Sequence, residues 1–218
     1  MTTHIEMLSD PLPPEPLAIA AGWLAQAWQE GHQPNPNAMV LATTSTEGRP
    51  SARVVLCKSI EPQPGFIVFY TNYESRKGRE LAATGRAAVV MHWDHVHRQV
   101  RVEGRVVVGP AADSDAYFAS RAVESRIGAW ASRQSQPIGS RAELLQAVES
   151  ATARYQAPDG SVPRPPHWGG FRLWADAVEL WVEGNARIHD RARWTRTLTP
   201  RGADQFDTGP WAATRLQP

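Results

Sequence analysis

The chain has 218 residues, enough for one large domain with a sizeable core that needs no disulfide or metal to hold it. Its 23 Lys and Arg against 22 Asp and Glu give a formal net charge of +1, which excludes a general electrostatic attraction to nucleic acid or anionic membranes. The single cysteine, Cys57, excludes an internal disulfide framework and a cysteine-based zinc site. The acidic N-terminus is no signal peptide and no apolar stretch reaches membrane-spanning length, so we expect a cytoplasmic protein without nucleic-acid or membrane partners.

The sequence predicts an N-terminal arm followed by four helices. Residues 1–16 carry four prolines and no periodic pattern, so we expect an irregular arm. Apolar residues then recur at helical spacing over 17–30, and Gly31 supplies a stop. Three further helices are predicted, each beginning at a serine that can cap it: 75–85, 114–119 and 140–155. In the last of them Glu143 stands at capping-box spacing from that serine.

Short runs of β-forming residues, separated by turn signals, fill the rest of the chain. The longest, 98–108, alternates valines with polar residues, which is typical of a half-buried antiparallel strand. Because successive runs are joined by short turns, we expect a mainly β (α+β) fold, an antiparallel barrel with peripheral helices over a single domain, 17–218. The predicted strands are 39–44, 53–60, 66–72, 87–93, 98–108, 171–174, 178–182 and, after a hairpin turn at Gly184-Asn185, 187–197.

Residues 187–191 (Arg-Ile-His-Asp-Arg) are the most informative local pattern. On a strand, Arg187, His189 and Arg191 project from one face. Two guanidiniums beside an imidazole repel each other, which an anionic or electron-rich ligand lying across that face would explain. A solvated strand face with an ion pair to Asp190 explains the same pattern, so both interpretations stay open.

Two further basic segments are candidates for holding a phosphate. Arg76 and Lys77 stand at the start of a predicted helix, where free backbone N–H groups attract anions. Arg53 and Lys58 face opposite sides of one apolar run, so both reach a single ligand only if the strand ends or twists near Lys58. Taken alone, each pair is equally explained as surface charge. Cys57 is interpreted as a small core filler.

Other catalytic signatures are weak or missing. The three histidines within residues 92–97 lie on a strand end and turn with one nearby carboxylate and no nearby cysteine, so we expect no metal site. No GxGxxG fingerprint follows a strand, and neither a P-loop nor a GxSxG elbow is present. Nucleotide hydrolysis and serine-hydrolase chemistry are therefore poor candidates.

Taken in order, ten stretches of the chain resemble the pyridoxine/pyridoxamine 5′-phosphate oxidase family, from about Asp10 to Pro218. Each is weak by itself, and their common order makes the resemblance specific. They are RVVLCK (53–58), FYTNYESRK (69–77), RQVRVEG (98–104), YFASR (117–121), SRIGAW (125–130), SRQS (132–135), WGGFR (168–172), VELW (178–181), RIHDR (187–191) and RLQP (215–218). The resemblance implies an FMN-binding split β-barrel and a homodimer with FMN at the subunit interface, with residues 168–218 completing the barrel and that interface.

The resemblance also implies which residues hold cofactor and substrate. Arg187 and His189 match the catalytic pair beside the substrate's pyridine ring, Arg187 fixing the ring and His189 binding or polarising its substituents. The substrate set is completed by a group that holds the substrate phosphate: Lys58, Tyr117, Arg121 and Ser125. The FMN set is Arg53, Val54, Val55, Leu56, Cys57, Lys58, Tyr70, Thr71, Arg76, Lys77, Gln99, Gln134, Ser135, Trp181 and Arg191, with Arg76 and Lys77 toward the phosphate.

The implied reaction is an FMN-dependent oxidation of pyridoxine 5′-phosphate or pyridoxamine 5′-phosphate to pyridoxal 5′-phosphate. Dioxygen accepts the electrons and gives H2O2, and the amine substrate also releases NH3. One alternative is a phenazine-type flavin oxidase of the same superfamily, which would need a larger apolar substrate site and no phosphate site. Another is a non-catalytic protein that binds FMN or a B6 vitamer, against which the intact pair Arg187 and His189 argues.

Overall fold

Within residues 6–218, which the computed structural model describes, the main sheet has nine strands. They are β1 (Ala38–Thr44), β2 (Pro50–Leu56), β3 (Ser59–Glu61), β4 (Phe66–Asn72), β5 (Arg86–Trp93), β6 (Arg98–Val108), β7 (Trp168–Val182), β8 (Asp190–Thr195) and β11 (Ala212–Leu216). All pair antiparallel in the order β11-β8-β7-β6-β5-β1-β2, while β4 pairs with the first half of β7 and carries β3. Strands β9 (Leu198–Pro200) and β10 (Phe206–Thr208) form a separate ribbon.

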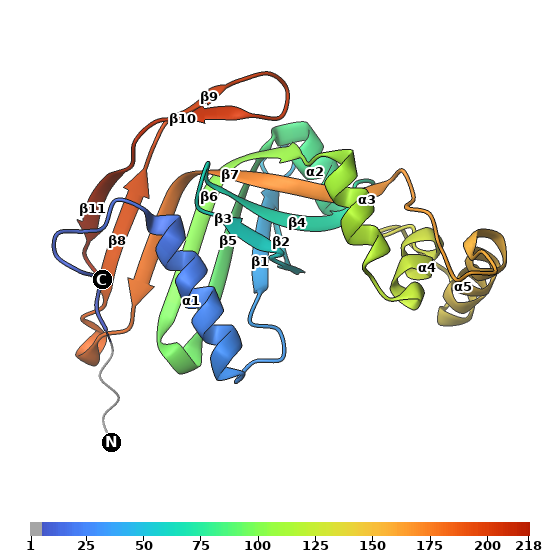
Figure 1. Ribbon diagram of the computed structural model, residues 1–218, viewed down its shortest axis with the longest axis horizontal. Coiled ribbons are helices and arrows are strands. Elements are labelled where there is room, and N and C mark those ends of the chain that lie inside the picture. The colour runs from blue at the N-terminus through green and yellow to red at the C-terminus, as the bar shows by residue number, and fades with distance from the viewer. Residues whose placement is uncertain (1–5) are drawn as a thin grey trace.

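The sheet curls because β7 exchanges one neighbour along its length. Its first half pairs with β4 and β6, and its second half pairs with β6 and β8. The result is the split barrel of Figure 1, in which β7 runs from the helices at one side of the molecule to the opposite side. The predicted mainly β, antiparallel fold with peripheral helices is confirmed.

The helices begin and end largely where local sequence signals predict. Over the described part of the chain they are α1 (Pro16–Glu30), α2 (Arg76–Thr84), α3 (Ala111–Ala119), α4 (Val123–Ala131) and α5 (Arg141–Tyr155). Ser75 and Ser140 each accept a hydrogen bond from the backbone N–H three residues on, at 3.2 and 3.1 Å. Gly31 and Gly85 end α1 and α2 in the left-handed conformation. Helix α4 has no predicted counterpart.

The predicted cap at Ser114 is wrong. Helix α3 begins earlier, with Pro110 at the N-cap position, and Ser114 lies inside it. The Ser114 hydroxyl donates to the Pro110 carbonyl oxygen at 3.3 Å and accepts from the Gly170 N–H at 3.0 Å. A serine that resembled a cap in sequence is thus a buried link between α3 and β7.

Strand lengths differ from prediction where tertiary pairing decides them. The predicted strand 53–60 is interrupted at residues 57–58, where the chain leaves β2 and pairs with β4 as β3. The predicted strands 171–174 and 178–182 are one strand, β7, because β6 pairs with it on both sides of the intervening residues. The ribbon β9–β10 and strand β11 were not predicted.

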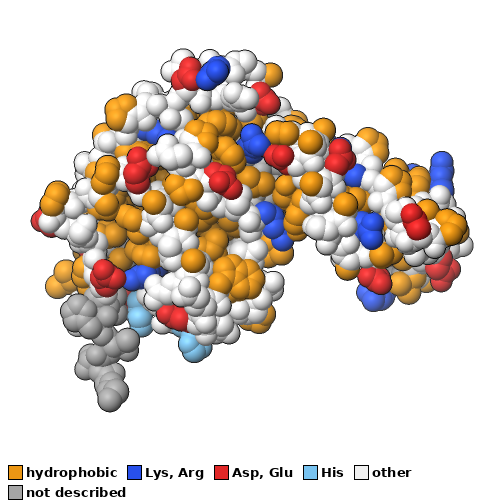
Figure 2. Space-filling model, viewed as in Figure 1, with side chains coloured by type: hydrophobic (Ala, Val, Ile, Leu, Met, Phe, Trp, Pro, Cys, Tyr) orange, Lys and Arg blue, Asp and Glu red, His pale blue; other side chains and the backbone are white. Residues whose placement is uncertain are grey.

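The main core lies between the sheet and α1, which crosses it in Figure 1. A smaller cluster, centred on Phe118, Ile127 and Trp168, packs α3, α4 and α5 into a helical lobe at the end of the sheet. Figure 2 shows this lobe projecting from the body of the molecule, with Lys and Arg side chains at the junction. Because Trp168 is the first residue of β7, this contact fixes the helical lobe to the start of that strand.

Residues 6–15 of the predicted arm pack along the C-terminal strands. The Leu8 N–H donates to Asp190 Oδ2 at 2.8 Å, and Trp194 Nε1 donates to the Pro13 carbonyl at 2.8 Å. Residues 1–5 lie outside the described residues, and the division into an arm (1–16) and one domain (17–218) stays a prediction. No helix in the described range combines the length and the apolar character that crossing a membrane requires.

The close contact of β6 with β7 makes Gly104 a sensitive position. The register of the two strands shifts there, and a Cβ on residue 104 would lie 1.8 Å from the Trp174 carbonyl oxygen. We expect Gly104→Ala to lower the free energy of unfolding by about 3 kcal/mol, measured by urea denaturation. Gly22→Ala in α1 is the control, because the added Cβ would meet no other described part of the chain within 4 Å. It should stabilise the protein by about 0.5–1 kcal/mol, and equal midpoints for the two variants would contradict the assignment.

Candidate functional site

A cavity of about 340 Å³ lies where the ends of β2 and β4 meet α2 and the helical lobe. We call it the cationic cavity because two lysines and two arginines line it. Its lining residues are Arg53, Val54, Val55, Leu56, Lys58, Tyr70, Thr71, Asn72, Lys77, Tyr117, Arg121, Gln134 and Trp168. All except Asn72 and Trp168 belong to the predicted FMN or substrate sets. The fold therefore brings together residues from separate stretches of the chain.

The end of strand β2 explains how Arg53 and Lys58 share this cavity. Strict alternation would place them on opposite faces, but β2 stops at Leu56. The Lys58 N–H then donates to the Val68 carbonyl at 2.8 Å, so the chain has already turned toward β4. The condition set by the sequence pattern, that the strand must end near Lys58, is met.

Lys77 is a buried cation with neutral partners. Its side chain, at the N-terminal turn of α2, donates from Nζ to Gln134 Oε1 at 2.6 Å and to Ser75 Oγ at 3.2 Å. Gln134 Oε1 also accepts from Thr71 Oγ1 at 3.4 Å. Burial, together with the nearby positive charge of Arg53, lowers the pKa of Lys77 to about 8. An anion in the cavity would restore the charge balance that this lysine lacks.

Arg121 and Lys58 are held by aromatic faces rather than by carboxylates. The Arg121 guanidinium lies 4.7 Å from the Trp168 ring, and Lys58 Nζ lies 5.1 Å from the Tyr117 ring. Burial lowers the pKa of Arg121, whose Nη1 is buried without a hydrogen-bond partner in the described structure. Tyr70, Tyr117 and Trp168 stack with ring centroids 4.1 to 6.1 Å apart. Both cations are therefore supported in place while remaining available to an anion.

Two adjoining hollows extend the cationic cavity into the helical lobe. One, of about 250 Å³, contains Ser125 beside Arg121, so the four predicted substrate-phosphate residues lie together. The other, of about 500 Å³, contains Ser135 beside Gln134. Both hollows depend on the chain around α4, which sequence patterns did not predict.

Two residues of the predicted FMN set that are close to this cavity in the chain, Cys57 and Arg76, line neither it nor its adjoining hollows. Cys57 is buried in the core, where burial raises the pKa of its thiol to about 12, in agreement with its interpretation as a core filler. Arg76 is half exposed and pairs with Glu80 at 2.9 Å.

A second group of predicted residues gathers at the other end of β7. In the strand register Trp181 lies opposite Gln99 on one side and Arg191 on the other. The His189 ring lies 4.6 Å from the Trp181 ring. Arg191 donates to Glu179 Oε1 at 2.9 Å, and its Nε is buried without a hydrogen-bond partner among residues 6–218. We call Gln99, Trp181, Arg187, His189 and Arg191 the second group.

The strand-face argument for residues 187–191 is wrong. Residues Asn185–Arg187 form a 3₁₀ turn, and β8 begins only at Asp190. Ala186 and Arg187 have φ of 52° and 65°, which no strand allows. Arg187 is exposed, and His189 Nδ1 accepts the Gly184 N–H at 3.2 Å. The residues are brought near one another by a turn, so strict alternation does not apply.

The two ends of β7 are far apart. Between Trp168, in the cationic cavity, and Trp181, in the second group, the chain covers about 40 Å along the strand at the usual rise per residue. Figure 1 shows β7 running from the helical lobe to the opposite side of the molecule. A small ligand held in the cationic cavity is out of reach of the second group of the same chain. A ligand that contacts both needs two copies of the chain.

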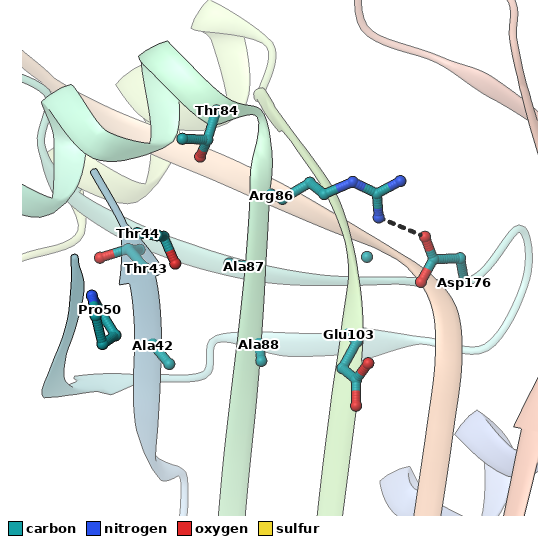
Figure 3. A pocket seen from close by; sticks show the side chains of 11 residues that line it. Ala42, Thr43, Thr44, Pro50, Thr84, Arg86, Ala87, Ala88, Glu103 and Asp176 are labelled. Atoms are coloured by element: carbon teal, nitrogen blue, oxygen red, sulfur yellow. Dashed lines mark hydrogen bonds and ion pairs between the residues drawn. The ribbon is translucent and has the colours of Figure 1, made fainter. Parts of the chain in front are cut away.

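A hollow of about 420 Å³ beside β5 fits an anion less well. It is lined by Arg86, which Figure 3 shows paired with Asp176, at 3.1 Å.

The histidines of residues 92–97 do not share one ligand site. His95 lies beside Glu30, and His97 lies beside Glu183. Over residues 6–218, no three His, Cys, Asp or Glu side chains gather as a metal site would require.

Sequence reasoning missed three residues of the site. Trp168 supports Arg121, Asn72 lines the cationic cavity and the adjoining hollow of about 250 Å³, and Glu80 binds two predicted FMN residues. Trp168 and Asn72 lie inside the stretches WGGFR and FYTNYESRK, which was an available signal. Glu80 lies three residues beyond FYTNYESRK, so no sequence signal pointed to it.

Family models match most of the chain. The model described as pyridoxamine 5′-phosphate oxidase matches residues 24–155, and that of the pyridoxine 5′-phosphate oxidase C-terminal dimerisation region matches residues 168–218. The chain belongs to the pyridoxamine 5′-phosphate oxidase family. The pyridoxine/pyridoxamine 5′-phosphate oxidase of Roseobacter denitrificans is 48% identical over 93% of this chain and 94% of its own length. That of Paracoccus denitrificans is 52% identical over 84% of this chain and 82% of its own length.

Solved structures of the family share the fold. PhzG from Burkholderia lata 383, in complex with tetrahydrophenazine-1-carboxylic acid, has a TM-score of 0.81 and 32% identity, covering 96% of this chain and 95% of PhzG. A pyridoxamine 5′-phosphate oxidase-related, FMN-binding protein from Nostoc punctiforme has a TM-score of 0.67 at 16% identity, covering 95% and 98% of the two chains, and supports the fold alone. The predicted family resemblance is thus confirmed.

Proposed function

We propose that this chain is an FMN-dependent oxidase of pyridoxine 5′-phosphate or pyridoxamine 5′-phosphate that forms pyridoxal 5′-phosphate with O2 as acceptor. It acts as a homodimer, with each site built from the cationic cavity of one subunit and the second group of its partner. The observation that carries the proposal is a pair of cations in one cavity, the buried Lys77 and the partly buried Arg121, neither of which has a carboxylate partner among the described residues. FMN and the vitamer each carry one phosphate, so Lys77 can pair with the phosphate of FMN and Arg121 with that of the vitamer.

FMN is the cofactor, and the donors present fit its phosphate. Lys77 supplies a cation at the N-terminus of α2, and Arg53 supplies a second at the cavity wall. Gln134 and Thr71 add neutral hydrogen-bonding groups beside Lys77. When bound, FMN supplies the two-electron acceptor that amino-acid side chains lack.

The substrate phosphate belongs with Arg121 in this proposal. Arg121 Nη1 and Lys58 Nζ offer charge, and the hydroxyls of Tyr117 and Ser125 lie in the same or the adjoining hollow. A dianion prefers such a set of cations and hydroxyls over either alone. These residues hold the substrate and take no part in bond breaking.

The partner's second group would face the vitamer ring. Because His189 Nδ1 accepts the Gly184 N–H, Nε2 is the ring nitrogen left to donate a hydrogen bond. His189 then acts as a hydrogen-bond donor to a ring substituent, not as a base at Nδ1. Arg187 makes no hydrogen bond within the described residues, so its guanidinium is free to fix the ring in place.

The proposal is tested on the purified protein. We expect a yellow protein that releases FMN on denaturation and consumes O2 with either vitamer phosphate. A colourless protein that ignores added FMN would refute the cofactor and the activity together. The cytoplasmic location stays a prediction.

A phenazine-type oxidase is the second candidate, because PhzG shares the fold closely. The Arg121 guanidinium, whose buried Nη1 an apolar substrate would leave unpaired, favours the vitamer phosphates. Assays with both substrate classes distinguish the two. Turnover of a reduced phenazine carboxylate with no oxidation of vitamer phosphates would select the phenazine-type reaction, and a yellow protein inert to both would select a binding protein.

Mixed dimers test the shared site. We expect Arg121→Met and Arg187→Ala homodimers each to be nearly inactive at low substrate concentration. Random mixing of the two subunits should restore about a quarter of wild-type activity, since half of the dimers then carry one intact site out of two. No recovery after subunit exchange, verified by differently tagged chains, would show that each site lies within one chain.

A further inference from the structure

A buried carboxylate lies directly behind the cationic cavity, on α2. Glu80 Oε2 accepts hydrogen bonds from Ser51 Oγ at 2.7 Å, from the Thr43 hydroxyl, and from Arg53 Nη2 at 3.4 Å. Its other oxygen, Oε1, accepts from Arg76 Nε at 2.9 Å. Burial raises the pKa of Glu80, but the hydrogen bonds from Ser51, Thr43 and Arg76 outweigh it and hold the pKa at about 2. The carboxylate is therefore ionised, buried and fully bonded.

Both arginines that contact Glu80 belong to the predicted FMN set. Arg53 uses its terminal nitrogens on Glu80, on the Leu41 carbonyl and on two hydroxyls, so its guanidinium is fixed at the cavity wall. Arg76 uses only Nε, and across residues 6–218 its two terminal nitrogens make no hydrogen bond. Glu80 thus fixes the guanidinium of Arg53 and leaves the two terminal nitrogens of Arg76 free to bind a ligand.

Charge alone does not explain a carboxylate at this position. A negative charge behind an anion site repels the anion, so Coulomb's law by itself predicts weaker phosphate binding with Glu80 than without it. An Arg–Glu pair four residues apart on a helix surface contributes little. Glu80, however, is 7% exposed and is bonded to two strands besides its own helix. What it provides is the orientation of the two arginines.

We propose that Glu80 is a positioning residue that orients Arg53 and Arg76 toward the phosphate of FMN. The inference rests on the proposed function, because it takes FMN to be the ligand of these arginines. Guanidiniums fixed before binding lose less conformational freedom when the phosphate arrives, and this gain exceeds the repulsion. The carboxylate contacts neither cofactor nor substrate in this proposal.

The test compares two flavins that differ only in the phosphate. Dissociation constants of FMN and riboflavin for the apoprotein are measured by flavin fluorescence in wild type and in Glu80→Gln. The glutamine keeps the shape but turns an NH2 group toward at least one arginine. We expect FMN affinity to fall about tenfold and riboflavin affinity to stay the same. Glu47→Gln, which removes an exposed carboxylate from the β1–β2 turn, is the matched control and should change neither.

The outcomes separate this inference from the proposed function. Equal weakening of FMN and riboflavin binding would make Glu80 a purely structural residue. Unchanged or tighter FMN binding would mean that Glu80 affects the phosphate only through its negative charge, not by orienting the arginines. Either result overturns the inference. If wild type binds no flavin, the proposed function fails and the inference with it. Should Glu80→Gln not fold, Ser51→Ala decides, since it removes one hydroxyl between Glu80 and Arg53 without changing charge. It should lower FMN affinity about threefold and spare riboflavin, and an unchanged ratio overturns the inference.

Discussion

Replacing Arg121 by Met is expected to raise the KM for a vitamer phosphate about 100-fold, because the phosphate then loses a partly buried cationic partner. The methionine keeps the apolar stem that packs against Trp168. Since Arg121 Nη1 is buried without a hydrogen-bond partner in the part of the chain that the structure describes, its removal should leave the apoprotein at least as stable in thermal denaturation. Loss of binding without loss of stability is the signature of a site held ready for its ligand.

The controls for this prediction lie in the substrate and in the chain. Oxidation of unphosphorylated pyridoxine, however slow, should be equally slow in wild type and Arg121→Met, because it has no phosphate to lose. Arg79→Met removes an exposed arginine of α2 and should leave the KM unchanged. A KM for the phosphorylated substrate within about threefold of wild type would remove Arg121 from the phosphate site.

FMN binding is expected to weaken as the pH rises above 8. The pKa of Lys77 in the folded protein is lowered to about 8, so the apoprotein loses this positive charge on going from pH 7 to pH 9. The FMN phosphate is already dianionic above pH 7, so it adds no titration in this range. Burial raises the pKa of Tyr70 and of Tyr73, so these phenols stay neutral. The dissociation constant should rise by up to about tenfold per pH unit above pH 8.

Lys77→Met tests the assignment. It should weaken FMN binding about 100-fold at pH 7 and abolish most of the pH dependence between 8 and 10. The sign of the stability change is opposite to that of binding. Because the unfolded lysine, with a pKa of 10.5, binds more protons between pH 8 and 10.5, the wild-type apoprotein gains stability over that window. A pH profile for FMN binding that is the same in wild type and Lys77→Met would contradict the role of this lysine.

Much of the fold could be predicted from local signals. Valine alternation over 98–108 matches β6, and the caps at Ser75 and Ser140 match the starts of α2 and α5. Ser114 shows where this reasoning stops, because its hydroxyl bonds to β7 across the fold. A cap is a contact within one turn and can be predicted from sequence, whereas such a link depends on residues far apart in the chain.

The sequence indicated which residues belong to the candidate site, but not how they are arranged in space. The order of ten short stretches identified the residues of the cationic cavity and of the second group. It did not reveal that they occupy opposite ends of β7, nor that a turn rather than a strand presents Arg187 and His189. The positive φ of Arg187 depends on how β7 and β8 pair, which no local pattern records.

By itself the sequence determined the family, the antiparallel strands and the chemical types at the site, because these follow from local spacing and from motifs in fixed order. Only the tertiary structure decided which cations lack a counter-charge. Arg86 is paired with Asp176, whereas Lys77 is buried and Arg121 partly buried beside neutral and aromatic groups, with no carboxylate partner among the described residues. Burial and pairing are set by contacts between distant residues, and a cation that folding has deprived of water and of a carboxylate is one that can bind a phosphate.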